Sequence, residues 1–325
     1  MNYFKVSIII PVKEINAYIH EAIPHYLQLE YSDYEVLIFP DELPDQSVME
    51  ELTSNGRVKI IASGKVGPAE KRDLSLRYAE GNVFAFSDDD AWPRKDWLKN
   101  AIAELKEEEV GAVGGPAITA PNDNLMQQGS GKVYESFLCS GKYTYRYLPG
   151  YRREDDDIPS VNLIVKREVF VQINGYDSTF YPGEDTKLCM DIVNAGYKII
   201  YSPKVLVYHH RRTLFKAHLK QITNYAKHRG YFAKKLPQTS LRLAYFIPTL
   251  FVIGLVVGPI LCLVSPILWW AYCGVLLVYF GLAAWSLRKC KNLALFGISL
   301  MGILLTHIGY GIFFVKGLYS KELLR

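Results

Sequence analysis

The sequence predicts an α/β domain built on a mostly parallel sheet, followed by a helical membrane region. In the first hundred residues, short apolar runs alternate with helical patterns, which is typical of a parallel sheet with helices on its faces. Further along, the chain carries no charged residue from Leu243 to Leu287, about twice the ~20 residues that cross a bilayer. These two observations define the expected architecture.

Each element of the sheet domain follows from a local pattern. The expected strands are the apolar runs Val6–Ile10, Glu35–Phe39, Val58–Ile61 and Val83–Phe86, and the expected helices lie near 16–29, 46–54, 68–79 and 95–107. A less regular stretch from about 111 to 208 ends in two strand-like runs, 197–201 and 205–208. Because ligands bind outside the carboxyl ends of strands in such sheets, the polar residues at 11–14, 41–45 and 88–90 are the first site candidates.

Charge is divided unevenly along the chain. The part up to Asp191 carries 32 of the 33 acidic residues against 20 Lys and Arg, whereas the remainder carries one acid against 17 Lys and Arg. Such asymmetry indicates either a nucleic-acid or a membrane partner for the basic part. The long apolar runs in that same part favour the membrane and exclude nucleic acid as the expected partner.

Three apolar runs predict membrane spans at about 243–264, 267–287 and 293–315, and residues 213–240 predict a basic amphipathic helix in the bilayer interface. The expected domains are therefore 1–212, 213–240 and 241–325. Basic residues ahead of the first and third spans place residues 1–240 in the cytoplasm, in a multi-pass protein of the cell (inner) membrane. The five cysteines lack metal-ligand or disulfide-framework spacing, which suits a reducing compartment.

The acidic triplet Asp88-Asp89-Asp90 directly follows an expected strand. Adjacent carboxylates repel one another unless a cation lies among them, and hard oxygen ligands suit Mg²⁺ or Mn²⁺. Such an ion could bridge the phosphates of a nucleotide sugar. Alone, the triplet would favour a solvated loop that caps the next helix; its position at a strand end and the further motifs favour the metal site instead.

Two further polar groups stand at element ends. Glu184 and Asp185 begin a helical pattern, where they could stabilise the helix dipole or supply a base that deprotonates a hydroxyl. The segment 209–212, His-His-Arg-Arg, follows a strand; a histidine there could bind a metal, and the arginines could hold phosphate. On its own, this second segment could be a basic surface loop.

The order of these motifs resembles that of the family 2 glycosyltransferases of GT-A fold, a Rossmann-like architecture, over roughly residues 4–212. The segments that carry the resemblance are Val6–Val12, Glu35–Asp41, Gly67–Asp73, Asp88–Asp90, Ser160–Asn162 and Asn174–Asp177. Three positions depart from the family pattern, namely Lys13-Glu14 after the first strand, Pro40, and Asp73 where Asn is usual. These departures concern the choice of base and sugar and not the reaction class.

The resemblance implies a role for each site residue. Asp185 is the expected base, with Glu184 beside it, and Asp90 and His209 are the expected metal ligands for Mn²⁺ or Mg²⁺, although His210 stays an alternative to His209. The expected donor-binding residues are Pro11, Val12, Glu14, Asp41, Lys71, Arg72, Asp88 and Asp89. Asn162, Arg211, Arg212, Gln221 and Tyr225 are expected on the phosphate or acceptor side. The helix that carries Gln221 and Tyr225 is either a lining of the acceptor cleft or a plain anchor.

The expected activity is inverting transfer of a sugar from a UDP-, GDP- or dTDP-sugar to a lipid-linked acceptor at the membrane, for a cell-surface glycan. Three spans and the absence of a Gln-x-x-Arg-Trp motif disfavour the alternative of a processive polysaccharide synthase. A second alternative is a non-catalytic membrane protein that binds sugar or acts as a scaffold; the set Asp88, Asp90, Asp185 and His209 argues against it. The sequence is compatible with a homo-oligomer.

Overall fold

The computed structural model describes residues 4–178 and 180–323, which divide into two compact units. The first unit comprises the chain up to Ile118 together with Leu148–His210, and the second comprises Thr119–Tyr147 and the chain from Arg211 onwards. The segment 119–147, which the sequence places in the sheet domain, thus groups with the C-terminal helices. The three-part division at 212 and 240 stays a prediction.

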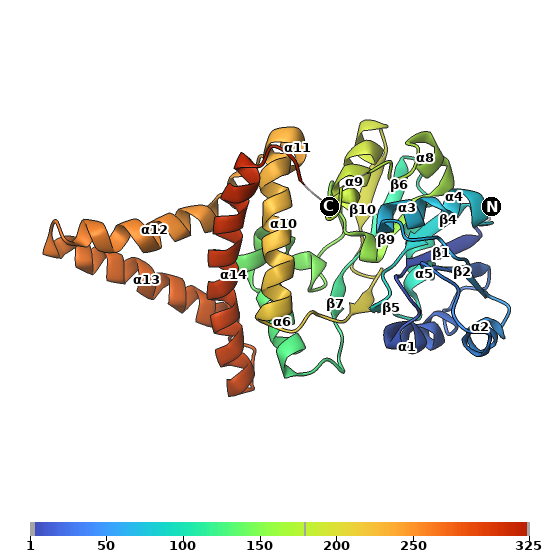
Figure 1. Ribbon diagram of the computed structural model, residues 1–325, viewed down its shortest axis with the longest axis horizontal. Helices are drawn as coiled ribbons and strands as arrows, with labels where there is room; N and C mark the ends of the chain where they lie inside the picture. Colours follow the sequence, from blue (N-terminus) through green and yellow to red (C-terminus); the bar gives the residue numbers. More distant parts are fainter. Residues whose placement is uncertain (1–3, 179, 324–325) are drawn as a thin grey trace. The chain divides into compact units, whose positions relative to one another are not determined.

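The first unit is built on an eight-stranded sheet of order β3-β2-β1-β4-β9-β6-β10-β8 (Figure 1). Its strands are β1 (Val6–Pro11), β2 (Tyr34–Phe39), β3 (Val58–Ile60), β4 (Val83–Phe86), β6 (Val110–Gly114), β8 (Arg153–Asp155), β9 (Leu163–Lys166) and β10 (Lys198–Tyr201). Strands β3, β2, β1 and β4 are parallel, with Ile9 opposite both Leu37 and Phe86. The expected mostly parallel sheet is therefore confirmed, with β9 antiparallel to β4 and to β6.

Helices and a smaller sheet surround these strands. The helices are α1 (Ala17–Tyr26), α2 (Gln46–Thr53), α3 (Pro68–Asp73), α4 (Ser75–Tyr78), α5 (Trp97–Glu104), α8 (Arg167–Gln172) and α9 (Glu184–Asn194). The expected helix at 68–79 is broken at Leu74 into α3 and α4. A three-stranded sheet has the order β5 (Ala91–Pro93), β11 (Val207–His209) and β7 (Ala117–Thr119), and it sets His209 opposite Ala91.

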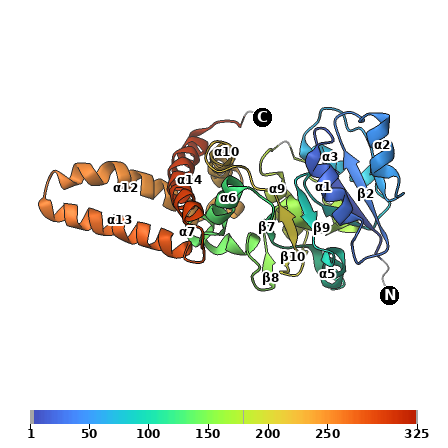
Figure 2. The same ribbon diagram turned by 90° about the horizontal axis from the view of Figure 1, so that it is seen from below.

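The second unit is helical. Its elements are α6 (Leu125–Glu135), α7 (Phe137–Ser140), the 3-10 turn η1 (Gly141–Arg146), α10 (Lys216–Lys235), α11 (Pro237–Ser240), the 3-10 turn η3 (Leu243–Tyr245), α12 (Ile247–Cys262), α13 (Pro266–Ser286) and α14 (Leu293–Tyr319). Helices α10 and α14 lie side by side (Figures 1 and 2). Their backbones touch closely, since a Cβ added at Gly230 would lie 2.1 Å from the Phe314 carbonyl oxygen.

The apolar face of α10, which the sequence predicts to enter the bilayer interface, is covered by α14. Ala226 and Ala233 pack with Phe314 in a buried cluster. Small residues on both helices allow this approach, as is common where helices pack tightly. An interfacial position of α10 therefore stays a prediction that depends on its lysine-rich face.

Three helices form where the sequence predicts spans, and by length and composition each could cross a membrane: Leu243–Cys262, Pro266–Ser286 and Leu293–Tyr319. Helices α12 and α13 form a hairpin that extends away from α10 and α14 (Figures 1 and 2). Only 6% of each hairpin helix is buried inside the protein, against 39% of α14. Of these three helices, the two of the hairpin are therefore the least covered by the rest of the protein, whereas α14 also packs against other helices.

Candidate active site

The acidic triplet lies where β4 ends and β5 begins, and β11 brings His209 beside it. The His209 Nε2 atom lies 3.1 Å from Asp90 Oδ1. One ligand atom from each of Asp88, Asp90 and His209 lies within 4.8 Å of the other two. Two carboxylates and an imidazole are a donor set that Mn²⁺ and Mg²⁺ accept. The residues present therefore fit the divalent ion that the sequence predicts.

The neighbouring residues of the same segments point elsewhere. Asp89 accepts a hydrogen bond from Asn16 Nδ2 at 2.6 Å, and Asn16 Oδ1 also caps α1 by accepting from the Ile19 amide. His210 Nε2 lies 3.1 Å from Glu21 Oε2, and its ring packs 4.9 Å from Trp92. The geometry thus favours His209 over His210 as the metal ligand. That Asn16 holds Asp89 was not predicted from the sequence, although an Asn directly ahead of a helix is a recognisable helix cap.

Arg72 connects the triplet to the expected catalytic pair. Its guanidinium is 4% exposed; Nη2 donates to Asp88 Oδ1 at 2.6 Å and Nη1 donates to Glu184 Oε1 at 3.3 Å. The guanidinium carbon also lies 5.5 Å from the centre of the Tyr176 ring. A buried arginine stays charged, so it holds two carboxylates from different elements in fixed positions.

Glu184 and Asp185 open α9 after Gly183, whose φ of 115° suits only glycine. Glu184 is buried and accepts from the Gly183 amide at 3.0 Å. Burial, helped by the negative charge of Asp185 and opposed by Arg72, raises the pKa of Glu184 to about 7. Asp185 is half-buried and accepts from the Thr186 amide at 2.8 Å. Glu184 therefore faces inward, and Asp185 is the more accessible carboxylate.

Two other acids that precede α9, Asp156 and Asp157, are further candidates for the base. Asp157 is buried and accepts from the Thr186 hydroxyl at 3.0 Å, whereas Asp156 is exposed and its backbone amide donates to Asp155 Oδ1 at 2.8 Å. Asp157 thus supports the start of α9. The role of Asp185 as the base stays a prediction.

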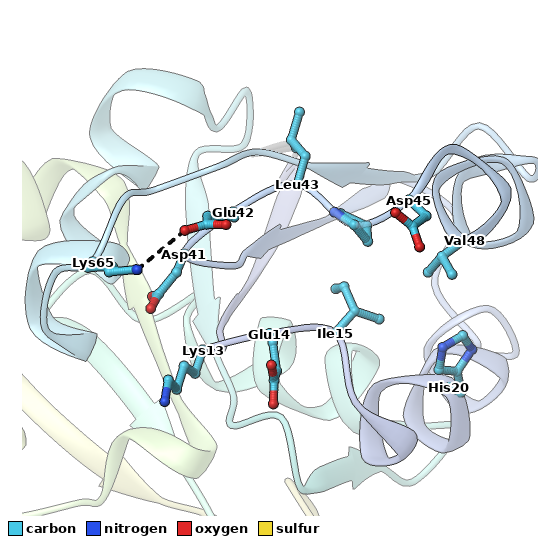
Figure 3. A pocket seen from close by; sticks show the side chains of 11 residues that line it. Lys13, Glu14, Ile15, His20, Asp41, Glu42, Leu43, Asp45, Val48 and Lys65 are labelled. Atoms are coloured by element: carbon cyan, nitrogen blue, oxygen red, sulfur yellow. Dashed lines mark ion pairs between the residues drawn. The ribbon is translucent and has the colours of Figure 1, made fainter.

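A pocket of about 490 Å³ lies at the carboxyl ends of β1 and β2 (Figure 3). It is lined by Lys13, Glu14, Ile15, His20, Asp41, Glu42, Leu43, Pro44, Asp45, Val48 and Lys65. The buried Lys71 ammonium donates to the Val12 carbonyl at 2.5 Å and to Asp41. Pro11 and Val12 are buried, so they shape this region through the backbone. Glu14 and Asp41, two of the expected donor-binding residues, thus line the same pocket.

The other expected residues have structural contacts. Asn162 is 1% exposed; its Oδ1 accepts from Trp97 Nε1 at 2.8 Å, and its Nδ2 donates to the carbonyls of Val205 and Pro116. These partners favour a structural role, because they use both ends of the amide. An acceptor role for Asn162 stays a prediction.

The remaining four predicted residues belong to the second unit. Arg211 is buried, donates through Nε to Thr119 Oγ1 at 3.3 Å, and lies over the ring of Tyr134. Gln221 accepts from the Tyr134 hydroxyl at 3.0 Å and donates to Tyr225 Oη at 3.2 Å. Arg212 is exposed. Their roles toward phosphate or acceptor stay predictions.

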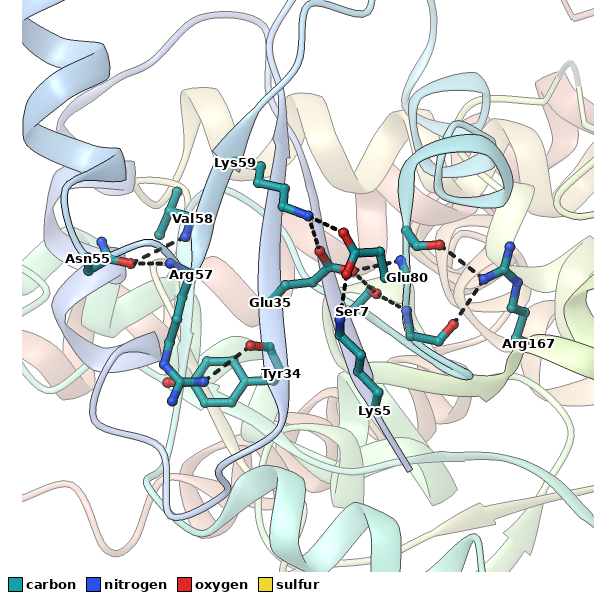
Figure 4. Close-up of polar contacts among 12 residues, drawn as sticks. Lys5, Ser7, Tyr34, Glu35, Asn55, Arg57, Val58, Lys59, Glu80 and Arg167 are labelled. Atoms are coloured by element: carbon teal, nitrogen blue, oxygen red, sulfur yellow. Dashed lines mark hydrogen bonds and ion pairs between the residues drawn. The ribbon is translucent and has the colours of Figure 1, made fainter. Parts of the chain in front are cut away.

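A polar network at the other ends of the strands is unrelated to this site. Buried Glu35 accepts from the Ser7 hydroxyl and the Glu80 amide, both at 2.7 Å, and pairs with Lys59 at 2.9 Å (Figure 4). Ser7 and Glu35 stand near the starts of β1 and β2, opposite the ligand edge of the sheet. This network therefore stabilises the sheet.

Comparison with known proteins agrees with the predicted family and fold. The model of the family described as "Glycosyl transferase family 2" matches residues 7–170, half of the chain. The protein belongs to this family of glycosyltransferases, and the predicted GT-A fold is confirmed.

Curated relatives show what this chain is similar to. It is 24% identical over 248 residues to the dolichyl N-acetyl-alpha-D-glucosaminyl phosphate 3-beta-D-2,3-diacetamido-2,3-dideoxy-beta-D-glucuronosyltransferase of Methanococcus voltae, covering 72% of this chain and 75% of that protein. It is 25% identical to the UDP-Glc:alpha-D-GlcNAc-diphosphoundecaprenol beta-1,3-glucosyltransferase of Escherichia coli, covering 59% and 71%. Against the pre-mycofactocin glycosyltransferase of Mycobacterium tuberculosis, at 29% identity, the match covers 45% of this chain and only 31% of the relative.

A solved structure matches nearly the whole chain. The mannosyltransferase from Pyrobaculum calidifontis, in complex with GDP-Man and Mn²⁺, gives a TM-score of 0.57 at 20% identity and covers 99% of this chain and 89% of its own. This likeness supports the fold.

Proposed function

We propose that the protein is an inverting, metal-dependent glycosyltransferase that moves a sugar from a nucleoside-diphosphate sugar to a polyprenyl-linked acceptor at the membrane. One observation carries this proposal: the buried Arg72 joins Asp88 of the acidic triplet to Glu184, the neighbour of Asp185. A donor diphosphate and an attacking hydroxyl need these two groups close together.

The residues divide the work. Asp88, Asp90 and His209 would hold Mn²⁺ or Mg²⁺, which neutralises charge on the leaving diphosphate when bound. Glu14 and Asp41 orient the base of the donor, and Arg72 fixes Asp88. Asp185 accepts the proton of the acceptor hydroxyl as that oxygen attacks the anomeric carbon from the face opposite the diphosphate. Glu184, paired with Arg72, positions the helix end that carries Asp185.

The acceptor class and location are supported by two features. The relatives from Methanococcus voltae and Escherichia coli are named for dolichyl- and undecaprenyl-linked substrates. The α12–α13 hairpin offers an apolar surface for insertion next to such lipids. We place the protein in the cell membrane with its sheet domain in the cytoplasm. The reason is that basic residues precede the first and the third apolar helices, and such residues favour the cytoplasmic side.

The test uses the full chain in membranes with UDP-, GDP- and dTDP-sugars and two acceptors, a polyprenyl phosphate and a polyprenyl-diphosphate-linked sugar. Wild-type protein should transfer one labelled sugar to lipid. Asp185→Asn should lower turnover about 10²–10⁴-fold with donor affinity unchanged. Asp191→Asn, in the same helix but paired with Lys187 at 2.7 Å, is the control.

Three outcomes would contradict the assignment. Near-normal turnover by Asp185→Asn would remove it as the base. Loss of donor binding as severe as in Asp90→Ala would place Asp185 in the metal site. A labelled product that grows to many sugars would favour a processive synthase.

A further inference from the structure

An arginine–tyrosine cluster in the second unit is not explained by the donor site. It comprises Tyr143 and Arg146 from η1, Arg229 from α10, Arg242, and Tyr245 from η3. The Tyr143 and Tyr245 rings are parallel, with an interplanar angle of 2° and centres 6.5 Å apart. We refer to these five residues as the Arg-Tyr cluster.

The cations of the cluster are held by specific contacts. The Arg146 guanidinium lies 4.3 Å from the Tyr143 ring centre, and the Arg229 guanidinium lies 5.0 Å from that of Tyr245. Arg229 also donates to the Ser240 hydroxyl at 3.3 Å. All five side chains are half-buried, unlike surface anchors that extend freely into water.

Hydrogen-bond direction leaves a donor at the centre of the cluster. Tyr143 Oη accepts from Arg242 Nη1 at 2.5 Å and from the Tyr245 hydroxyl at 3.3 Å. Because its oxygen accepts both of these bonds, the Tyr143 hydroxyl still has its own O–H proton to donate to a ligand. Guanidinium groups bind the oxygens of phosphates and carboxylates through paired hydrogen bonds, so the cluster suits an anionic group such as a phosphate.

The chain around the cluster indicates what the phosphate is attached to. No Asp or Glu occurs between Asp191 and Glu322, so the segment that supplies Arg229 and Arg242 brings no carboxylate of its own. Arg242 directly precedes the long apolar run, whose first residues are strongly exposed: Leu243 by 88% and Ile247 by 62%. A ligand that meets both features combines a phosphate head with a hydrocarbon tail.

We infer that the Arg-Tyr cluster binds the phosphate or diphosphate group of the isoprenoid lipid acceptor, with the lipid chain running along η3 and α12. The inference rests on the proposed function and adds the residues that select an acceptor anchored through phosphate. Arg229, Arg242 and Tyr143 position the acceptor and take no part in bond making.

The experiment measures binding of farnesyl phosphate, a short isoprenoid phosphate, to the full chain in neutral detergent. Arg229→Gln and Arg242→Gln should each weaken binding about 10- to 100-fold, since each removes a charge-assisted hydrogen-bonding group. Tyr143→Phe, which keeps the ring, should weaken it less. Arg288→Gln is the matched control, because Arg288 lies over Trp285 outside the cluster. Farnesol, which lacks phosphate, should bind at least tenfold more weakly.

Measurements of turnover with the same variants distinguish a failure of this inference from a failure of the proposed function. The same variants should raise the KM for the polyprenyl acceptor and leave the donor KM and slow donor hydrolysis unchanged. Unchanged acceptor KM in an active enzyme would overturn the inference, as would equal competition by phosphatidylglycerol, which would make the cluster a general headgroup site. If wild-type protein binds farnesyl phosphate but transfers sugar to no lipid, the cluster stands and the proposed function fails. Arg242→Lys should keep part of the affinity that Arg242→Gln loses. The melting temperature of each variant serves as the folding control, because a folding defect would lower it.

Discussion

Replacing the buried Glu184 by Gln should make the protein more resistant to unfolding at pH 8 and have little such effect at pH 4.5. The pKa of Glu184 is raised from 4.5 to about 7, chiefly by burial, although Arg72 lies 3.3 Å away. Gln is neutral and similar in shape to the protonated carboxyl group. The variant therefore imitates the state that the folded protein prefers.

The sign and size of this change in the free energy of unfolding follow from the difference between the folded and unfolded pKa of Glu184. Below pH 4.5, the carboxyl is protonated in the folded and unfolded chain alike, so it adds no pH dependence. Between pH 4.5 and 7 the unfolded chain releases the proton while the folded chain keeps it, so the free energy of unfolding falls as pH rises. A shift of about 2.5 pKa units corresponds to about 3 kcal/mol, fully lost above pH 7. Gln removes this loss.

The assay is thermal unfolding of the full chain in detergent with EDTA, at several pH values. The melting temperature of Glu184→Gln relative to wild type should rise by about 6–12 °C between pH 4.5 and 8, at ~2–4 °C per kcal/mol. Any loss of the hydrogen bond from the Gly183 amide would change the melting temperature of the variant equally at both pH values, so it cancels when the two differences from wild type are compared. Glu168→Gln, an exposed residue in the first turn of α8, is the control. A relative melting temperature independent of pH would refute the claim that burial governs Glu184, and one that falls with pH would show that the Arg72 pair dominates.

Three further changes test other parts of the structure. Asp90→Ala should weaken Mn²⁺ binding at least about tenfold in calorimetric titration, because a ligand carboxylate is lost; equal affinity would remove Asp90 from the metal site. Gly230→Ala should cost about 1–3 kcal/mol of stability, since the new Cβ meets the Phe314 carbonyl oxygen at 2.1 Å. Gly297→Ala in α14, with open space around it, should cause no loss of stability in the same melting assay, because Ala favours a helix over Gly. Burial raises the pKa of Asp73 from 3.8 to about 6, so this carboxyl group makes wild-type stability fall between pH 4 and 6. Asp73→Asn should remove the Asp73 share of that slope in pH-dependent unfolding and leave the share of Glu184; an unchanged slope would contradict it.

Local patterns in the sequence predicted most of the sheet domain. The run Val6–Pro11 is apolar throughout because both faces of a central parallel strand are buried, and that signal needs no knowledge of the rest of the chain. The acids at 88–90 could be assigned to a strand end for the same reason. The meeting of Asp90 with His209 was inferred from a family resemblance, because over a hundred residues separate them and no periodicity relates them.

Long-range packing is what the sequence could not predict. The segment 119–147 has ordinary helical and loop patterns, and only the fold shows that Val133 joins Leu214 and Ile303 in a buried cluster. The apolar stripe of α10 was correctly read as a helix face, but its partner is α14. An apolar stripe predicts that this face of the helix is covered by apolar groups, but it does not predict whether these belong to lipid or to protein.

The short helix α3 supplies a buried cation to each of two parts of the proposed donor site, namely the pocket and the acidic triplet. Lys71 and Arg72 are consecutive, and consecutive helical residues point about 100° apart, so their cations reach different places. Lys71 binds Asp41 and the Val12 carbonyl beside the pocket, whereas Arg72 binds Asp88 and Glu184. Each buried cation compensates carboxylates that would otherwise repel one another at the sheet edge. The residues that we propose to bind the donor are therefore held in fixed positions by these contacts, which is the condition under which electrostatic groups would act most strongly on a reacting diphosphate.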